Sequence, residues 1–201
     1  DEEGARLNVE AEIPNWDFEG VMKQANTVWN EALGKIDIET SDNDSRTVFY
    51  TSLYHAFIQP SLASDVDGRY RTMGHEIKQD ASYTNYTVFS LWDTFRAAHP
   101  LYTIVTPEQN QAFIRSLLRK YDEGGILPKW ELASNETGTM IGYHAVSVIA
   151  DAMMKKQCDF DVKKALEACI RSSVYDTTGV TPMMERQILN GKLMPVSIKY
   201  K

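Results

Sequence analysis

Apolar residues recur at intervals of three and four along much of the chain, and prolines and glycines mark where these repeats stop. This spacing places the apolar side chains on one face of an α-helix, whereas an exposed β-strand would alternate apolar and polar residues. Between Asp17 and Lys35 the pattern predicts a helix with one buried face, formed by Phe18, Val21, Met22, Ala25, Val28, Trp29, Ala32 and Leu33. We therefore expect a mainly helical chain.

Prolines end two of the predicted helices. The second helix covers residues 45–59 and stops before Pro60, because a proline disfavours helical geometry in the residue that precedes it. The third helix lies within residues 85–99 and ends at Pro100.

The fourth helix has the clearest start signal. Thr106 is suited to the N-cap, Pro107 to the first helical position, and Gln109 to a capping box with the threonine. Three later helices are predicted over residues 138–156, 161–173 and 181–191. Only residues 36–39 and 195–200 suggest short strands, so the predicted class is all-α.

Composition limits the kinds of function. The chain has 201 residues, 43% of them hydrophobic and 24% charged, which is ordinary for one globular domain. A net charge of −7 argues against binding to the phosphates of nucleic acids. No run of about 18 apolar residues occurs, so no membrane-spanning helix is predicted.

Trp92 and Asp93 stand side by side in residues 85–100, the most distinctive stretch of the chain. Sugar sites combine an aromatic surface for the C–H side of a pyranose with a carboxylate that accepts from its hydroxyls. This pair makes a carbohydrate site the first functional hypothesis. The structural alternative is a core tryptophan and an ion pair between Asp93 and Arg96, one turn later.

Three further motifs occur with residues 85–100, and together they resemble one family. They are Ser-Asp-Val-Asp-Gly-Arg-Tyr-Arg at 64–71, Leu-Pro-Lys-Trp-Glu-Leu at 127–132 and Asn-Glu-Thr-Gly-Thr-Met-Ile-Gly-Tyr-His-Ala at 135–145. In this order they resemble glycoside hydrolase family 92, and the resemblance runs from about residue 13 to the C-terminus. It implies a calcium-dependent, inverting exo-α-mannosidase of bacterial glycan-degrading systems.

The resemblance also implies an (α/α)6 barrel, which is a helical toroid of six inner and six outer helices. The predicted helices are too few to close such a barrel. We therefore expect residues 1–201 to be a single-domain fragment, the first part of the catalytic domain, which packs against the remainder of the same polypeptide. The family's catalytic acid, its base and most of its calcium ligands lie further along. We expect no catalytic residue and no metal ligand in this segment, and an inactive fragment.

The predicted substrate-binding residues are Trp92, Asp93, Asn135 and Glu136. The resemblance implies that Asp93 accepts hydrogen bonds from a terminal mannose and that Trp92 forms an apolar wall, neither of them transferring a proton. Asn135 and Glu136 precede the helix predicted at 138, where the helix dipole stabilises a carboxylate. They are candidates for the pocket or for anchoring a loop, and a plain capping acid is the alternative for Glu136.

Other polar residues are weaker candidates. We interpret His144 as a histidine of the core and Glu131, beside Trp130, as a secondary carboxylate candidate. Residues 65–68 resemble the start of a calcium loop. Arg69 and Tyr70 occupy positions where an EF-hand needs an oxygen ligand and a glycine, so we expect a structured loop there.

The function predicted for the intact parent is that of a secreted or periplasmic bacterial α-mannosidase, which uses calcium and acts on mannose-containing glycans. Two alternatives stay open. One is another (α/α)6 glycosidase or a polysaccharide lyase, which would act on a different sugar. The other is a helical scaffold without enzymatic activity that binds carbohydrate or protein. Sequence beyond Lys201 would separate them, because continuing helices with clustered acids would support the hydrolase.

Overall fold

The computed structural model describes residues 2–174, which form mainly helices joined by short antiparallel strands. The helices are α1 (Glu2–Glu12), α2 (Phe18–Leu33), α3 (Asn43–Ile58), α4 (Leu91–Thr94), α5 (Ala98–Val105), α6 (Pro107–Gly124), α7 (Ala145–Met154) and α8 (Val162–Ser173). The strands are β1 (Ser61–Leu62), β2 (Arg69–Arg71), β3 (Ile77–Gln79), β4 (Tyr86–Thr87), β5 (Phe89–Ser90), β6 (Trp130–Leu132) and β7 (Asn135–Glu136). The expectation of a mainly helical chain is confirmed, whereas an all-α class is wrong.

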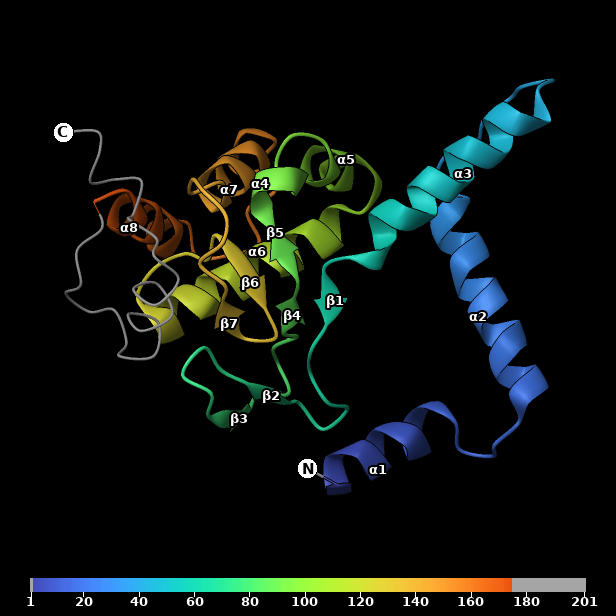
Figure 1. Ribbon diagram of the computed structural model, residues 1–201, viewed down its shortest axis with the longest axis horizontal. Helices are drawn as coiled ribbons and strands as arrows, with labels where there is room; N and C mark the ends of the chain where they lie inside the picture. Colours follow the sequence, from blue (N-terminus) through green and yellow to red (C-terminus); the bar gives the residue numbers. More distant parts are fainter. Residues whose placement is uncertain (1, 175–201) are drawn as a thin grey trace.

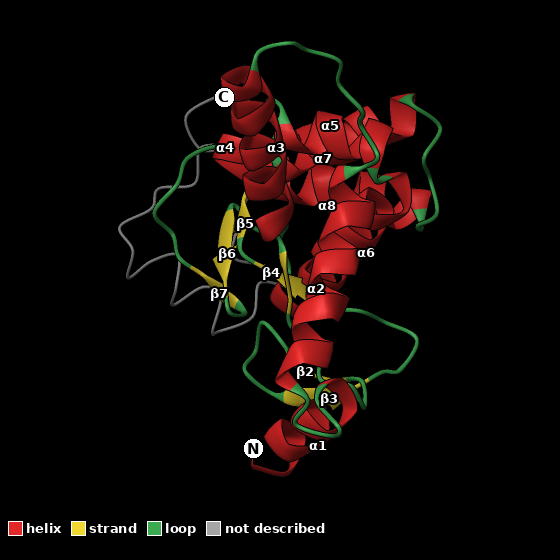
Figure 2. Cartoon of the chain, turned by 90° about the vertical axis from the view of Figure 1, so that its right-hand side faces the viewer, coloured by secondary structure: helices red, strands yellow, loops and turns green. Residues whose placement is uncertain are grey.

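The strands form three small sheets. β1 pairs with β4, β2 pairs with β3, and β5, β6 and β7 form a three-stranded antiparallel sheet. Each strand is only two or three residues long, which is too short for alternation to be visible in the sequence. The β2–β3 hairpin lies close to α1 (Figures 1 and 2), where Asn8 of α1 donates a hydrogen bond to Asp65.

The hydrophobic core lies among α5, α6, α7, α8 and the start of α4 (Figure 1). It consists of Phe89, Leu91, Tyr102, Phe113, Ile114, Leu117, Leu118, Leu127, Ala145, Val148, Ile149, Ala152, Ala165 and Ala168. The helices α2 and α3 form an arm that projects from this body. No helix within residues 2–174 is long and apolar enough to cross a membrane.

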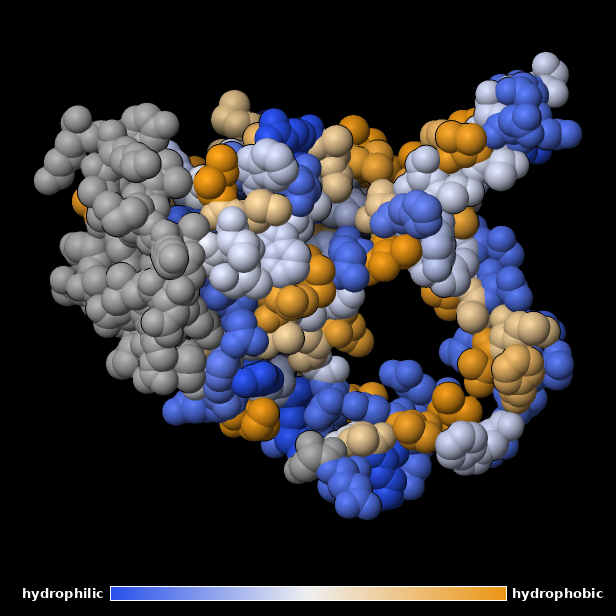
Figure 3. All heavy atoms as spheres, in the orientation of Figure 1, coloured by the Kyte–Doolittle hydropathy of each residue, from blue (hydrophilic) through white to orange (hydrophobic). Residues whose placement is uncertain are grey.

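The helix predicted over 17–35 is confirmed, but its apolar face is not buried. Asp17 caps α2 by accepting a hydrogen bond from the Gly20 amide, as a helix start requires. None of the described side chains of α2 is buried, and Phe18 remains 75% exposed. Figure 3 shows apolar side chains around an open gap between this arm and the body.

Proline and glycine place the ends of α3 and α6 as predicted. α3 stops at Ile58, two residues before Pro60, and α6 begins at Pro107. The expected capping box is wrong, because the Thr106 side chain makes no capping hydrogen bond and only its carbonyl accepts from the Asn110 amide. Gly125 ends α6 in the left-handed conformation, with φ of 89°.

The third predicted helix is mostly absent. Residues 86–90 are the strands β4 and β5, and α4 is a single turn of four residues. Val88, between the two strands, has a φ of 66°, which no helix continues through. Pro100 does not end a helix but lies in the first turn of α5. Backbone N–H groups in the first turn have no acceptor within the helix, so a proline there costs no hydrogen bond.

The fifth predicted helix begins later than expected. Gly138 and Gly142 adopt left-handed conformations, with φ of 69° and 82°, so residues 138–144 form a loop and α7 starts at Ala145. The helix expected over 161–173 is confirmed as α8, with Asp161 as its N-cap. Residues 36–39 are not a strand. The predictions over 181–191 and 195–200 lie outside the described residues.

Candidate functional site

The short helix α4 presents Trp92 and Asp93 at the surface. Leu91, its first residue, is fully buried in the core and holds the helix against the body. Trp92 is partly exposed and Asp93 is exposed. β5 runs directly into α4, so the position of both side chains depends on the three-stranded sheet.

The carboxylate of Asp93 is oriented by the residue that precedes the helix. The Ser90 hydroxyl donates a hydrogen bond to Asp93 Oδ2, and the Ser90 carbonyl accepts one from the Thr94 hydroxyl. Within the described part of the chain no ion pair joins Asp93 to Arg96. The ion pair considered from the sequence is therefore not formed there, and the role of Asp93 in binding stays a prediction.

Arg96 and His144 extend the surface around Trp92. The Arg96 guanidinium carbon lies 5.1 Å from the centroid of the Trp92 ring and 4.8 Å from that of Phe95. The His144 ring stacks on Phe95, with centroids 4.1 Å apart and planes 4° from parallel. We call Trp92, Asp93, Phe95, Arg96 and His144 the α4 cluster.

The sequence suggested that His144 is a histidine of the core, and this interpretation is wrong. It is only partly buried and precedes the first turn of α7. Desolvation, followed by the charge of Arg96, lowers the pKa of its imidazole. A neutral imidazole near pH 7 can both donate and accept hydrogen bonds, which suits a polyhydroxylated ligand.

Glu136 lies in β7 and not at a helix N-terminus, because the loop 138–144 separates it from α7. Its side chain is 3% exposed. Its carboxylate accepts hydrogen bonds from the backbone amides of Lys129 at 2.7 Å, Gly138 at 3.0 Å and Trp130 at 3.3 Å. Burial raises its pKa, although these backbone bonds act in the opposite direction. These contacts support loop anchoring, and contact with substrate stays a prediction.

Asn135 contacts the turn that joins β6 to β7. Its amide nitrogen donates to the carbonyls of Leu132 and Ala133, and its Oδ1 lies 2.6 Å from His75 Nε2. A role for Asn135 in binding substrate also stays a prediction.

Comparison with known proteins decides the family. The model of the glycosyl hydrolase family 92 catalytic domain matches residues 4–193. The chain belongs to glycoside hydrolase family 92. The resemblance noted from its motifs is therefore confirmed.

Solved family 92 structures are similar to this chain over most of its length. The α-mannosidase BT3965 of Bacteroides thetaiotaomicron is 38% identical with a TM-score of 0.83, and the match covers 92% of this chain and 24% of that one. It is also known in complex with mannoimidazole. The inverting mannosidase BT2199 of the same organism is 31% identical with a TM-score of 0.80, covering 90% of this chain and 25% of its own.

A curated fungal relative agrees with the family. An uncharacterized secreted glycosidase of Arthroderma benhamiae is 29% identical over 178 residues, which are 86% of this chain and 19% of the relative. The family 92 chain thus spans about a quarter or less of the length of these relatives.

The calcium implied by family 92 has no evident site in the described residues. Within residues 2–174, no group of three or more His, Cys, Asp or Glu side chains is placed to hold a metal ion. Residues 65–68 form a structured loop, as expected, in which Gly68 turns with a φ of 82° and Asp67 pairs with Arg69. We assign no calcium ligand to this segment.

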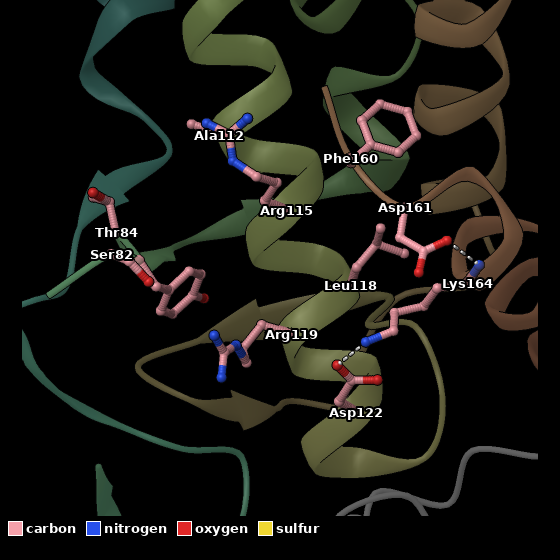
Figure 4. A pocket seen from close by; sticks show the side chains of 11 residues that line it. Ser82, Thr84, Ala112, Arg115, Leu118, Arg119, Asp122, Phe160, Asp161 and Lys164 are labelled. Carbon is pink, nitrogen blue, oxygen red and sulfur yellow. Dashed lines mark hydrogen bonds and ion pairs between the residues drawn. The ribbon is translucent and has the colours of Figure 1, made fainter. Parts of the chain in front are cut away.

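A separate cavity of about 440 Å³ lies between α6, α8 and residues 82–84 of the family 92 chain (Figure 4). Its three cations are each matched by a carboxylate at 2.7 Å, in the pairs Arg115–Asp159, Arg119–Asp80 and Lys164–Asp122. These pairs join neighbouring elements. None of the residues that line the cavity belongs to the α4 cluster.

Proposed function

We propose that this chain is part of a secreted, calcium-dependent, inverting exo-α-mannosidase that acts on mannose-containing glycans. Membership of family 92 and similarity to two solved mannosidases support this proposal. We further propose that the α4 cluster forms part of the pocket for the terminal mannose. The observation that carries this assignment is the exposed Asp93 beside Trp92, on a turn fixed by buried Leu91.

The α4 cluster has the chemistry of a sugar site. A carboxylate held by Ser90 accepts charge-assisted hydrogen bonds from hydroxyl groups. The Trp92 ring supplies apolar surface for C–H groups. Arg96, which lies over this ring, and His144, which stacks on Phe95, add hydrogen-bond donors to the cluster. In this assignment, these side chains bind and orient the terminal residue of the glycan.

We place the chemical step outside this segment. An inverting glycosidase needs a carboxylic acid to protonate the leaving oxygen and a carboxylate to activate water, about 6.5–9.5 Å apart. The buried carboxylates of the described chain, Glu131 and Glu136, each accept hydrogen bonds from backbone amides and are almost fully shielded from solvent. Their burial supports the proposal that neither carries out proton transfer.

The test is hydrolysis of an aryl α-mannoside and of mannobiose by the intact protein, before and after removal of calcium by a chelator. We expect turnover that is lost with the chelator and restored by calcium, and release of β-mannose observed by NMR. Cleavage of another sugar in preference to mannosides would favour the alternative of a different (α/α)6 glycosidase or a polysaccharide lyase. Binding of mannan without any hydrolysis would favour the scaffold.

A further inference from the structure

Three residues beside the strands β5, β6 and β7 hold backbone conformations that side chains disfavour. Val88, Ala133 and Ser134 have φ of 66°, 50° and 62°. Val88 is β-branched, which makes a left-handed conformation especially costly. It lies where the chain leaves its pairing with β1 and enters its pairing with β6. Each such residue is strained and persists only where its surroundings enforce the conformation.

Ala133 and Ser134 form the tight turn between β6 and β7. Leu132 pairs with Asn135, so these two residues are the whole loop of the hairpin. A two-residue turn with positive φ at both positions normally contains Asn-Gly or a similar pair. Here the turn has two side chains and no glycine, so other contacts must hold it.

We call Thr87–Val88 and Ala133–Ser134 the two strained turns. One buried carboxylate contacts both of them. Glu131 Oε1 accepts hydrogen bonds from the Ser134 amide at 2.6 Å, the Thr87 hydroxyl at 3.1 Å and Lys120 Nζ at 3.2 Å. Thr87, which precedes Val88, also accepts a hydrogen bond through its hydroxyl from the Ala133 amide at 2.7 Å. Thr87 and Glu131 therefore fasten the two turns to each other.

Lys120 connects these contacts to the core helix α6. Its side chain is 1% exposed, that of Glu131 is 0% exposed, and Lys120 Nζ also lies 3.3 Å from Asn85 Oδ1. Burial lowers the pKa of Lys120, and the charge of Glu131 opposes that shift. Glu131 Oε2 and Asn85 Nδ2 have no hydrogen-bond partner among the described residues.

A buried ion pair with such unsatisfied atoms is a poor source of stability. Apolar side chains of similar size usually stabilise a core equally well or better. Stability therefore does not explain this ion pair, whereas its location next to the segment that leads into α4 suits a role in positioning that helix. The segment it fixes continues through Phe89 and Ser90 into α4, and Ser90 orients Asp93.

We infer that Lys120, Glu131 and Thr87 are positioning residues of the sugar site, and we call them the clamp. The clamp holds the two strained turns together and thereby sets β5 and α4 so that Trp92 and Asp93 face the sugar. None of the three touches the sugar in this assignment. The identity of the ligand rests on the proposed function. The claim that the clamp fixes the conformation of residues 86–95 does not depend on it.

The test compares one substitution at two positions of the intact protein. Thr87→Val removes the hydroxyl that links Glu131 to the Ala133 amide. Thr103→Val serves as the matched control, since Thr103 is 5% exposed and its hydroxyl donates to the Pro100 carbonyl in α5 and accepts from Lys155 Nζ. The measurements are kcat/KM on an aryl α-mannoside, the Kd for mannose by calorimetry, the melting temperature, and amide hydrogen exchange of residues 86–95.

We expect Thr87→Val to lower kcat/KM and to raise the Kd for mannose by about tenfold each, since small displacements in a site are costly. Exchange within residues 86–95 should become faster. Thr103→Val should leave these three quantities unchanged, even if its melting temperature falls as far. Equal behaviour of the two variants would overturn the inference.

Glu131→Gln provides a second variant that keeps the size and one oxygen of the side chain. If it folds, we expect the same faster exchange in 86–95; if it does not, the Thr87 comparison decides alone. An unaltered protein that neither binds mannose nor cleaves α-mannosides would refute the proposed function. The exchange comparison would still show whether the clamp holds residues 86–95.

Discussion

Arg96 lies over the Trp92 ring, 5.1 Å from guanidinium carbon to centroid, and makes no ion pair with Asp93 within the described residues. A cation over an indole gains about 0.5–1 kcal/mol at an exposed site. With Arg96 held by the aromatic rings, the exposed carboxylate of Asp93 keeps its charge available for a ligand. This arrangement is the basis of the first prediction.

Asp93→Ala in the intact protein should lower kcat/KM on α-mannosides by more than about tenfold and leave the melting temperature nearly unchanged. The lost charge-assisted hydrogen bond is worth about 1.5–3 kcal/mol. Steady-state kinetics and thermal melting check this. The control is Asp159→Ala, which removes an exposed partner of Arg115 far from α4 in sequence. An unfolded variant whose folded fraction keeps normal kinetics would make Asp93 a structural residue.

Glu136→Gln should destabilise the protein by about 1–3 kcal/mol. Three backbone N–H groups converge on this carboxylate, and the amide NH2 of glutamine cannot accept from them. Denaturant unfolding measures the change. The KM of the folded variant separates the two roles left open for Glu136, because a loop anchor without sugar contact should leave KM within about twofold. A rise in KM with unchanged stability would instead favour the pocket.

His99 should make stability depend on pH between about 6.5 and 4. Its imidazole is 1% exposed, and burial lowers its pKa to about 4, although the hydrogen bond with Asn110 opposes this. The unfolded chain, with a histidine pKa near 6.5, takes up a proton more readily, so stability falls as pH decreases through this window. The effect is about 3 kcal/mol in full.

The His99 prediction is checked by the variant His99→Gln. Melting temperatures measured between pH 7 and pH 4 should decline less for this variant than for the unaltered protein. The carboxyls of Asp42, Asp67 and Asp80 have lowered pKa values and therefore act below this window. Parallel declines for the two proteins would mean that His99 does not titrate in this way.

The isolated chain of 201 residues should self-associate. Exposed apolar side chains on α2 and α3 include Phe18, Val28 and Val48, which are 75%, 57% and 65% exposed. Apolar patches beyond several hundred Å² usually mark association surfaces. Size-exclusion chromatography with light scattering should show a mass that rises with concentration. Val28→Ser with Val48→Ser should reduce it, whereas the control Met154→Ser, at an exposed site on α7, should not.

The isolated chain should have no mannosidase activity. Binding and positioning residues alone leave the glycosidic bond without proton transfer. Incubation with an aryl α-mannoside at high protein concentration, with and without calcium, measures this. Calcium-dependent turnover by the purified chain would place the acid and the base inside this segment and contradict our assignment.

Several helix ends of the chain could be predicted from local signals. Pro60, Pro107, Gly125 and Asp161 mark ends that the structure reproduces. The helix expected over 85–99 was wrong because apolar composition alone does not separate a short buried strand from a helix. The left-handed φ of Val88 occurs beside contacts that the sequence does not show. Thr87 donates a hydrogen bond to Glu131, which also accepts from Lys120, and both partners are over 30 residues away in sequence.

Only part of the candidate site could be predicted from the sequence. Trp92 and Asp93 could be selected because their chemistry is recognisable in the sequence and their motif belongs to a family. His144 joins them only through the loop 138–144, whose two left-handed glycines replace the predicted start of a helix. Glu131 was selected only as a secondary carboxylate candidate, and Lys120 gave no signal, because a lysine and a glutamate eleven positions apart in sequence do not indicate a buried ion pair.

The burial of Asn85 restricts how the protein can be produced. Asn85, Tyr86 and Thr87 form an acceptor sequence for N-linked glycans, yet Asn85 is 2% exposed and its Oδ1 accepts from Tyr83 and lies beside Lys120. A eukaryotic secretory pathway reads such a sequence on the nascent chain, before α6 can pack against it. A glycan attached there has no room in the finished fold, so a host without this modification is the appropriate source of folded material.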